Sequence, residues 1–285
     1  NYRECGRGVV CDETGNNIYV ACQRKSDTKY VLLKVSRTTP GDATSTWTIT
    51  EMSWPGTSDV QIHQMFMWPD EPGILYAACM PFGAGNGGVY KFNTVTGTST
   101  LLTIAGTGDV PGGTNTDFTD CYGVNISGSK YLFVTRGWLD GGTAVFRYDV
   151  TNAVWKNITP TTYTGTNTAW HCVVGRELNG DAAVYIASWN QDKTSTGNFT
   201  FSPGCQPASA AGQNSPYYAT LLRTLNGTAA TPTWEVVSTA TTVGSLGAGR
   251  IVYGTGPFDG PGERWVEADS GENFSEGSRL GGFNQ

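Results

Sequence analysis

Aromatic, acidic and basic side chains gather in segments of this sequence that are expected to be loops at one face of the molecule. Tryptophan rings stack on the faces of sugar rings, while polar and charged side chains bond to sugar hydroxyls. The sequence therefore predicts a carbohydrate-binding site, with cleavage of a glycosidic bond as a further hypothesis. The candidate ligand-binding residues are Trp138, Trp170, Trp189, Arg136, His63 and His171, and the candidate catalytic residues are Asp140, Asp120 and Asp59.

Asp140 is the first candidate for a catalytic carboxylate, because the Gly141-Gly142 pair that follows it lets the backbone bend close to a substrate. Its partner would be Asp120 or Asp59, which lie in two other loops expected at the same face. Glycosidic cleavage needs one protonated and one ionised acid, about 5–5.5 Å apart for retention or about 6.5–9.5 Å for inversion. In a competing interpretation, Asp140 only caps the turn before Gly141, as Asp-Gly pairs commonly do.

The aromatic and histidine candidates also have two interpretations. Trp138 and Trp170 would stack on the sugars that flank the cleaved bond, or the tryptophans only cap the ends of the sheets. The chain has two histidines. In one interpretation they contact the ligand, and in the other they form hydrogen bonds with loop carbonyl groups. Because no Cys-x-x-Cys pair or histidine cluster occurs, no metal and no cofactor is expected.

Composition narrows the classes of partner. The 285 residues carry a net charge of −6 without a basic run, so nucleic acid is not expected as a partner. No run of 18 apolar residues occurs, so membrane insertion is not expected either. With 39 Thr and 38 Gly, the chain favours strands and turns over a helical bundle.

A repeat with a period near 55 residues must position the candidate loops. In each unit a β-branched residue or Leu precedes an aromatic residue and small apolar residues, and a basic residue follows downstream. The aromatic residues are Tyr19, Tyr76, Phe133 and Tyr185, and the basic residues are Lys34, Lys91, Arg147 and Arg223. One further apolar run before them and a Thr- or Trp-rich run after them complete four short strands per unit. The fourth unit carries an insertion around 191–216.

Four antiparallel strands at this period predict an all-β fold, a β-propeller of five blades. One blade cannot bury both of its faces, so we expect the repeated aromatic residues at equivalent buried positions between blades. The repeated basic residues are expected at solvated edges or on carbonyl groups. The fifth unit begins at Arg250 and thins out, which predicts an incomplete last blade. The expected single domain, 1–285, has blades at roughly 1–54, 55–106, 107–160, 161–240 and 241–285.

Three segments carry a resemblance to a known group of propellers. Residues 68–77 (WPDEPGILYA) and 87–91 (GGVYK) resemble a blade of the BNR/Asp-box propellers, and 269–274 (DSGENF) resembles a degenerate Asp-box. That group includes xyloglucanase-type glycoside hydrolases, sialidases and sortilin-like receptors. The segment from Asp140 to Gly142 is similar to the part of xyloglucanase-type enzymes that carries a catalytic Asp. The resemblance implies a propeller that acts on or binds glycans, with Asp269 shaping a turn.

Seven cysteines and five Asn-x-Ser/Thr sequons are consistent with a protein outside the cytoplasm. The expected order of the strands predicts that three pairs of cysteines form disulfides while Cys11 is a buried free thiol. The predicted pairs are Cys5–Cys22, Cys79–Cys121 and Cys172–Cys205. The candidate glycosylation sites are Asn125, Asn157, Asn198, Asn226 and Asn273.

Two functions follow from these observations. The first is a secreted or surface-exposed propeller that binds a polysaccharide or another glycan. The alternative is a structural or interaction propeller, a subunit of an extracellular filament, phage tail or virion, in which a protein partner or a second copy completes the fifth blade. Both place the protein outside the cell, on a cell surface or on a virion surface.

Overall fold

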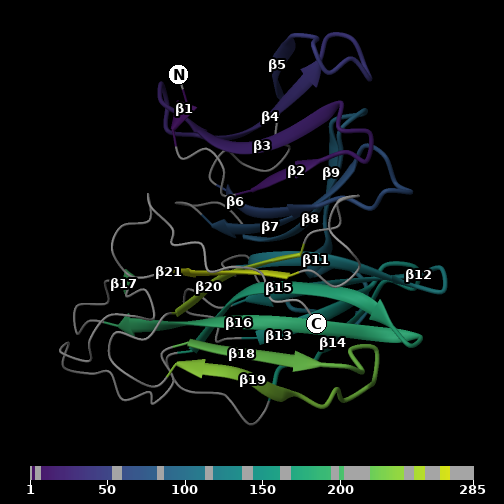
Figure 1. Ribbon diagram of the computed structural model, residues 1–285, viewed down its shortest axis with the longest axis vertical. Coiled ribbons are helices and arrows are strands. Elements are labelled where there is room, and N and C mark those ends of the chain that lie inside the picture. Colours follow the sequence, from purple (N-terminus) through teal and green to yellow (C-terminus); the bar gives the residue numbers. More distant parts are fainter. Residues whose placement is uncertain are drawn as a thin grey trace.

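A computed structural model gives the arrangement of most of the chain (Figure 1). It describes residues 2–3, 8–52, 60–81, 87–112, 118–136, 144–160, 168–193, 199–201, 219–240, 247–253 and 264–269. These residues form an all-β, propeller-like fold of antiparallel sheets, four of which have a core of four strands. Among them, no helix is long and apolar enough to cross a membrane.

The first two sheets follow one another in the chain, and Figure 1 shows the first at the top and the second beneath it. The first consists of β1 (Tyr2–Arg3), β2 (Val9–Cys11), β3 (Asn17–Arg24), β4 (Tyr30–Arg37) and β5 (Trp47–Met52), with β1 and β2 both paired to β3. The second consists of β6 (Val60–Phe66), β7 (Ile74–Pro81), β8 (Gly88–Asn93) and β9 (Thr98–Leu101) in chain order. Each is thus an up-and-down meander of local hairpins.

The remaining sheets repeat the meander with additions. The third is built from β11 (Phe118–Ile126), β12 (Ser129–Arg136), β13 (Ala144–Asp149) and β14 (Val154–Asn157), with β10 (Thr107–Gly108) on its outer edge. The fourth is built from β15 (Thr168–Leu178), β16 (Asp181–Lys193), β18 (Ala219–Thr224) and β19 (Glu235–Ala240), with β17 (Phe199–Phe201) paired to β16. The fifth contains β20 (Gly247–Tyr253) and β21 (Arg264–Asp269). The predicted fold class is confirmed, while the blade boundaries stay a prediction.

The predicted repeat register is confirmed by the strand pairing. The four repeated aromatic residues lie on the second main strand of their sheets, and each is at most 5% exposed. Each is also paired across the ladder with the repeated basic residue of its unit. The pairs are Tyr19 with Lys34, Tyr76 with Lys91, Phe133 with Arg147 and Tyr185 with Arg223. The equivalent position in the fifth sheet belongs to Trp265, which is paired with Val252 as Tyr76 is with Phe66.

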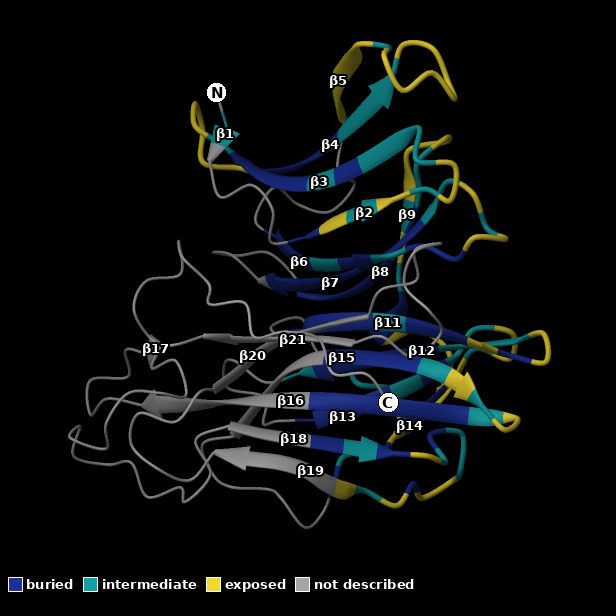
Figure 2. Ribbon diagram, viewed as in Figure 1, coloured by how far each residue is buried: buried dark blue, intermediate teal, exposed yellow. Residues whose placement is uncertain are grey.

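Three of these aromatic side chains fill the interfaces between successive sheets. Tyr19 belongs to the core cluster shared by the first and second sheets, Tyr76 to that of the second and third, and Phe133 to that of the third and fourth. Buried residues accordingly run through the middle of the stacked sheets, whereas β5 is exposed (Figure 2). Side chains alternate between the two faces of a strand, so each of these three rings points toward the next sheet and packs between the two sheets.

Three of the repeated basic residues have different partners: Arg147 binds carbonyl groups, Lys91 lies over an aromatic ring and Arg223 pairs with the carboxylate of Glu235. Arg147 Nη1 donates to the carbonyl oxygens of Gly227 and Ala229, in the turn between β18 and β19 of the fourth sheet, at 2.8 and 3.0 Å. The Nζ atom of Lys91 lies 5.6 Å from the ring centre of Tyr76. Arg147 thus shows the carbonyl bonding expected at these positions.

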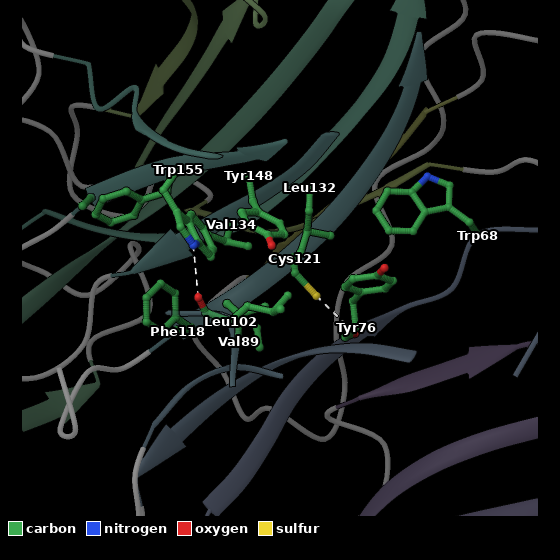
Figure 3. Close-up of a cluster of buried hydrophobic side chains, with 13 residues drawn as sticks. Trp68, Tyr76, Val89, Leu102, Phe118, Cys121, Leu132, Val134, Tyr148 and Trp155 are labelled. Carbon is green, nitrogen blue, oxygen red and sulfur yellow. Dashed lines mark hydrogen bonds between the residues drawn. The ribbon is translucent and has the colours of Figure 1, made fainter. Parts of the chain in front are cut away.

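A short segment fastens the second sheet to the third. The 3₁₀ helix η1 (Leu102–Ile104) leads into β10, which pairs in parallel with β14. The indole Nε1 of the fully buried Trp155 donates to the carbonyl oxygen of Leu102 at 3.1 Å (Figure 3). It also donates to the carbonyl oxygen of Ala105 at 3.1 Å. Gly108 has φ +81°, and a Cβ atom there would overlap the carbonyl oxygen of Trp155. Glycine is therefore required for this close approach.

Replacing Gly108 tests the importance of this contact for stability. We expect Gly108→Ala to lower the free energy of unfolding by about 3 kcal/mol or more, since it adds a backbone clash to the cost of a positive φ. Gly128→Ala is the matched control, because Gly128 has φ +89° with nothing within 4 Å of the added Cβ. The control should cost only about 1–2 kcal/mol. Urea denaturation measures both, and equal losses would contradict the assignment.

Candidate functional site

The first strands of the second to fifth sheets contain an irregularity at the same place. The pairing shifts by one residue in β6, β11, β15 and β20, as in a β-bulge. The extra residues are His63, Thr119, His171 and Gly249. Both histidines of the chain thus occupy one structural position in two different sheets.

The bulges bring six of the predicted site residues to one end of three neighbouring sheets. β11 packs beside β6 on one side and β15 on the other. At this end lie His63, Asp120, Arg136, Trp170, His171 and Trp189, in β6, β11, β12, β15, β15 and β16. The sequence predicted loops here, and the residues are instead in strands, because the ladders continue past the bulges: Phe118 pairs with Arg136 and Ala169 with Trp189.

For three of the six residues, the structure also describes the side chain. His63 is buried, and Arg136 is half-buried with its guanidinium carbon 5.5 Å from the ring centre of Phe146. Removal from water lowers the pKa of Arg136, which still leaves it a cation at neutral pH. For Trp170, His171 and Trp189 only the backbone position is described.

Asp120 is a buried acceptor. Its side chain is 8% exposed, its Oδ1 accepts a hydrogen bond from the backbone N–H of Cys121 at 2.8 Å, and its Oδ2 accepts from the backbone N–H of Val173 at 2.9 Å. Val173 belongs to β15, so the carboxylate spans two sheets. These contacts favour a structural role over proton transfer, which needs access to a substrate.

Two buried threonines beside the bulge were not among the predicted site residues. The hydroxyl of Thr119, the extra residue of β11, lies 2.9 Å from that of Thr135 and 3.3 Å from its carbonyl oxygen. Both side chains are at most 3% exposed. In the sequence, Thr119 stands 14 residues before Phe133, as His171 does before Tyr185. That equal spacing is the signal from which Thr119 could have been identified as the counterpart of His171.

Three candidates lie outside the described residues, namely Asp59, Trp138 and Asp140. The separation of two catalytic carboxylates therefore stays a prediction. Of the glycosylation candidates, Asn125 and Asn157 are exposed, Asn226 is half-buried, and Asn198 and Asn273 are outside the described residues.

The predicted disulfide between Cys79 and Cys121 is wrong, because both are buried free thiols. Alternation along β7 places Cys79 in the cluster shared with the first sheet, whereas Cys121 belongs to the cluster on the other face of the second sheet. There the Sγ of Cys121 lies 3.5 Å from the carbonyl oxygen of Tyr76. Burial raises the pKa of both thiols.

The prediction for Cys11 is half right. It is a free thiol, but it is exposed rather than buried. Its neighbour Val10 packs against the second sheet, so Cys11 points the opposite way along β2. The partners proposed for Cys22 and Cys172, which are Cys5 and Cys205, lie outside the described residues, so those two pairings stay predictions.

Comparison with known proteins agrees with the fold. No family model and no curated protein matches the sequence. Among solved structures, the chain is similar to an endosialidase of phage phi92, with a TM-score of 0.50 and 12% sequence identity. The likeness covers 94% of this chain and 52% of that one, so the chain spans about half the length of the endosialidase. At this identity the likeness concerns the fold.

The cysteine environments predict a selective alkylation pattern. In the native protein N-ethylmaleimide should label Cys11 and leave Cys79 and Cys121 unlabelled, because burial shields both sulfurs and disfavours their thiolates. Denaturation in urea without reductant should expose both to the reagent. Peptide mapping by mass spectrometry reads each site separately. A Cys79–Cys121 cross-linked peptide would contradict the structure.

Proposed function

We propose that this chain is a carbohydrate-binding propeller module that receives its ligand at the bulged ends of the second, third and fourth sheets. The observation that carries the proposal is the shared register of the bulges. The backbone of Trp170, His171 and Trp189 lies at the same end of the fourth sheet as Arg136 does on the third sheet and His63 on the second.

The chemistry of this set suits a sugar. Indole rings offer flat apolar surfaces for pyranose rings, and the imidazole and guanidinium groups supply hydrogen bonds to hydroxyl groups. The propeller-like fold shared with a phage endosialidase supports a glycan ligand and a place outside the cell or on a virion surface. Glycosidic cleavage remains a narrower hypothesis. Since Asp120 bonds to two backbone N–H groups, Asp140 with Asp59 is the favoured acid pair.

One observation favours the second candidate function, an interaction or assembly propeller of a filament or phage tail. The face of the first sheet that points away from the second carries exposed apolar side chains. These are Val9, Trp47 and Ile49, exposed by 44%, 41% and 65%. Such a surface suits a protein partner, which can be a second copy of this chain.

Light scattering would detect self-association through this surface. Ile49→Lys should abolish it, because the substitution places a charge on the exposed apolar surface.

A glycan array with matched tryptophan variants tests the carbohydrate site. We expect the wild-type chain to bind a defined set of glycans and Trp170→Ala or Trp189→Ala to weaken binding about tenfold, the equivalent of one lost stacking contact. Trp47→Ala is the control, since Trp47 lies at the start of β5 on the first sheet. Absence of binding by the wild-type chain, or an equal loss in the control, would contradict the proposal.

A further inference from the structure

We infer that Asp120, a candidate catalytic acid in the sequence, is a positioning residue that holds β15 in place and with it the backbone of Trp170 and His171. The inference rests on the proposed carbohydrate site and assigns one of its determinants. The carboxylate lies on the third sheet, whereas the residues it would position belong to the fourth.

Two bulges lie on the neighbouring strands β11 and β15. The pairing shifts between Phe118 and Asp120 in β11, and between Trp170 and Cys172 in β15. A bulge disrupts the regular ladder around it, so nearby backbone N–H groups need other acceptors. The N–H groups one residue beyond the two shifts, on Cys121 and Val173, donate to the two oxygens of the same carboxylate.

A carboxylate can accept hydrogen bonds from both N–H groups, because both of its terminal atoms are acceptors. Gln64 occupies the same register position in the second sheet, pairing with Ala78 as Asp120 pairs with Thr135. Its Oε1 accepts from the backbone N–H of Met65 at 3.2 Å, the counterpart of the bond to Cys121. The second terminal atom of a Gln or Asn amide is a donor, so it cannot accept from an N–H group of the next sheet.

The connection reaches the candidate site through strand pairing. Val173 lies three residues after Trp170, which is paired with Ser188. The next pair in the ladder joins Ala169 to Trp189. Fixing the N–H of Val173 therefore fixes the part of β15 that carries one tryptophan and pairs with the other. Because these bonds are charge-assisted and buried, losing one leaves an unsatisfied N–H group.

Asp120→Asn is the direct test, with Asp181→Asn as its matched control. Asp181 begins β16 at the far end of the fourth sheet, where its Oδ1 accepts from the backbone N–H groups of Ala182 and Thr228. Both variants remove one negative charge, but only Asp120→Asn must lose a backbone contact, because Asp120 accepts with both oxygens whereas Asp181 accepts both N–H groups with Oδ1, which an Asn oxygen can replace. Asp120→Asn should therefore also lower the melting temperature more than Asp181→Asn does. Asp120→Asn should weaken glycan binding about tenfold and speed hydrogen exchange at Val173. Asp181→Asn should leave glycan affinity unchanged.

Further measurements separate this inference from the proposed function. Combined with Trp170→Ala, Asp120→Asn should add little further loss of affinity, because both act through the same strand. If wild-type binding and the Trp170→Ala loss are observed but Asp120→Asn binds normally, the positioning role is overturned and the carbohydrate site stands. If Asp120→Asn does not fold, Asp120→Glu keeps two acceptor oxygens. It should fold with weakened affinity, and unchanged affinity would overturn the role.

Discussion

The structure depends on one constraint, which is that a sheet with two apolar faces must be covered on both of them. Each described sheet is built from contiguous sequence, so the contacts between sheets come from stacking. Tyr19, Tyr76 and Phe133 meet this need by filling the three interfaces between the first four sheets. Their burial explains why the aromatic position recurs while the surrounding turns vary in length.

The stacking also determines where chemistry can occur. Neighbouring sheets meet where β11 packs against β6 and β15, so side chains at the ends of these strands come together from residues more than 50 positions apart, as Asp120 and Val173 do. The bulges interrupt the ladder there and turn polar residues such as His63 and Thr119 into the interior. Polar side chains at the bulges can form hydrogen bonds with the backbone groups that have lost their ladder partners, and they can also form a binding site.

The sequence was sufficient for the fold class and for the register of the strands, because the aromatic and basic residues repeat with the period of the sheets. The positions of Trp170 and Trp189 at the same end as His63 followed from that register. The bulges could not be predicted, since a bulge depends on contacts with the neighbouring sheet rather than on local propensity. For the same reason the sequence predicts an acid in a loop at Asp120 and does not reveal its partner Val173, which lies 53 residues away.

The disulfide prediction failed for a related reason. Cys79 and Cys121 come from adjacent sheets, and their side chains lie on opposite faces of the second sheet. A shift of one residue along a strand changes the face that a side chain occupies. Spacing along the chain placed them near each other but did not reveal which face each occupies.

The strand that follows η1 also has a consequence for association between chains. An unpaired outer strand offers its backbone groups to any other extended segment, which is a route to aggregation. Within the described residues, the third sheet ends in β10, whose two residues leave almost no template for such growth and whose last residue, Gly108, has φ +81°. The first sheet ends instead in the six residues of β5. Among the residues that the structure describes, growth is therefore limited at the outer edge of the third sheet, whereas β5 leaves that of the first open to pairing.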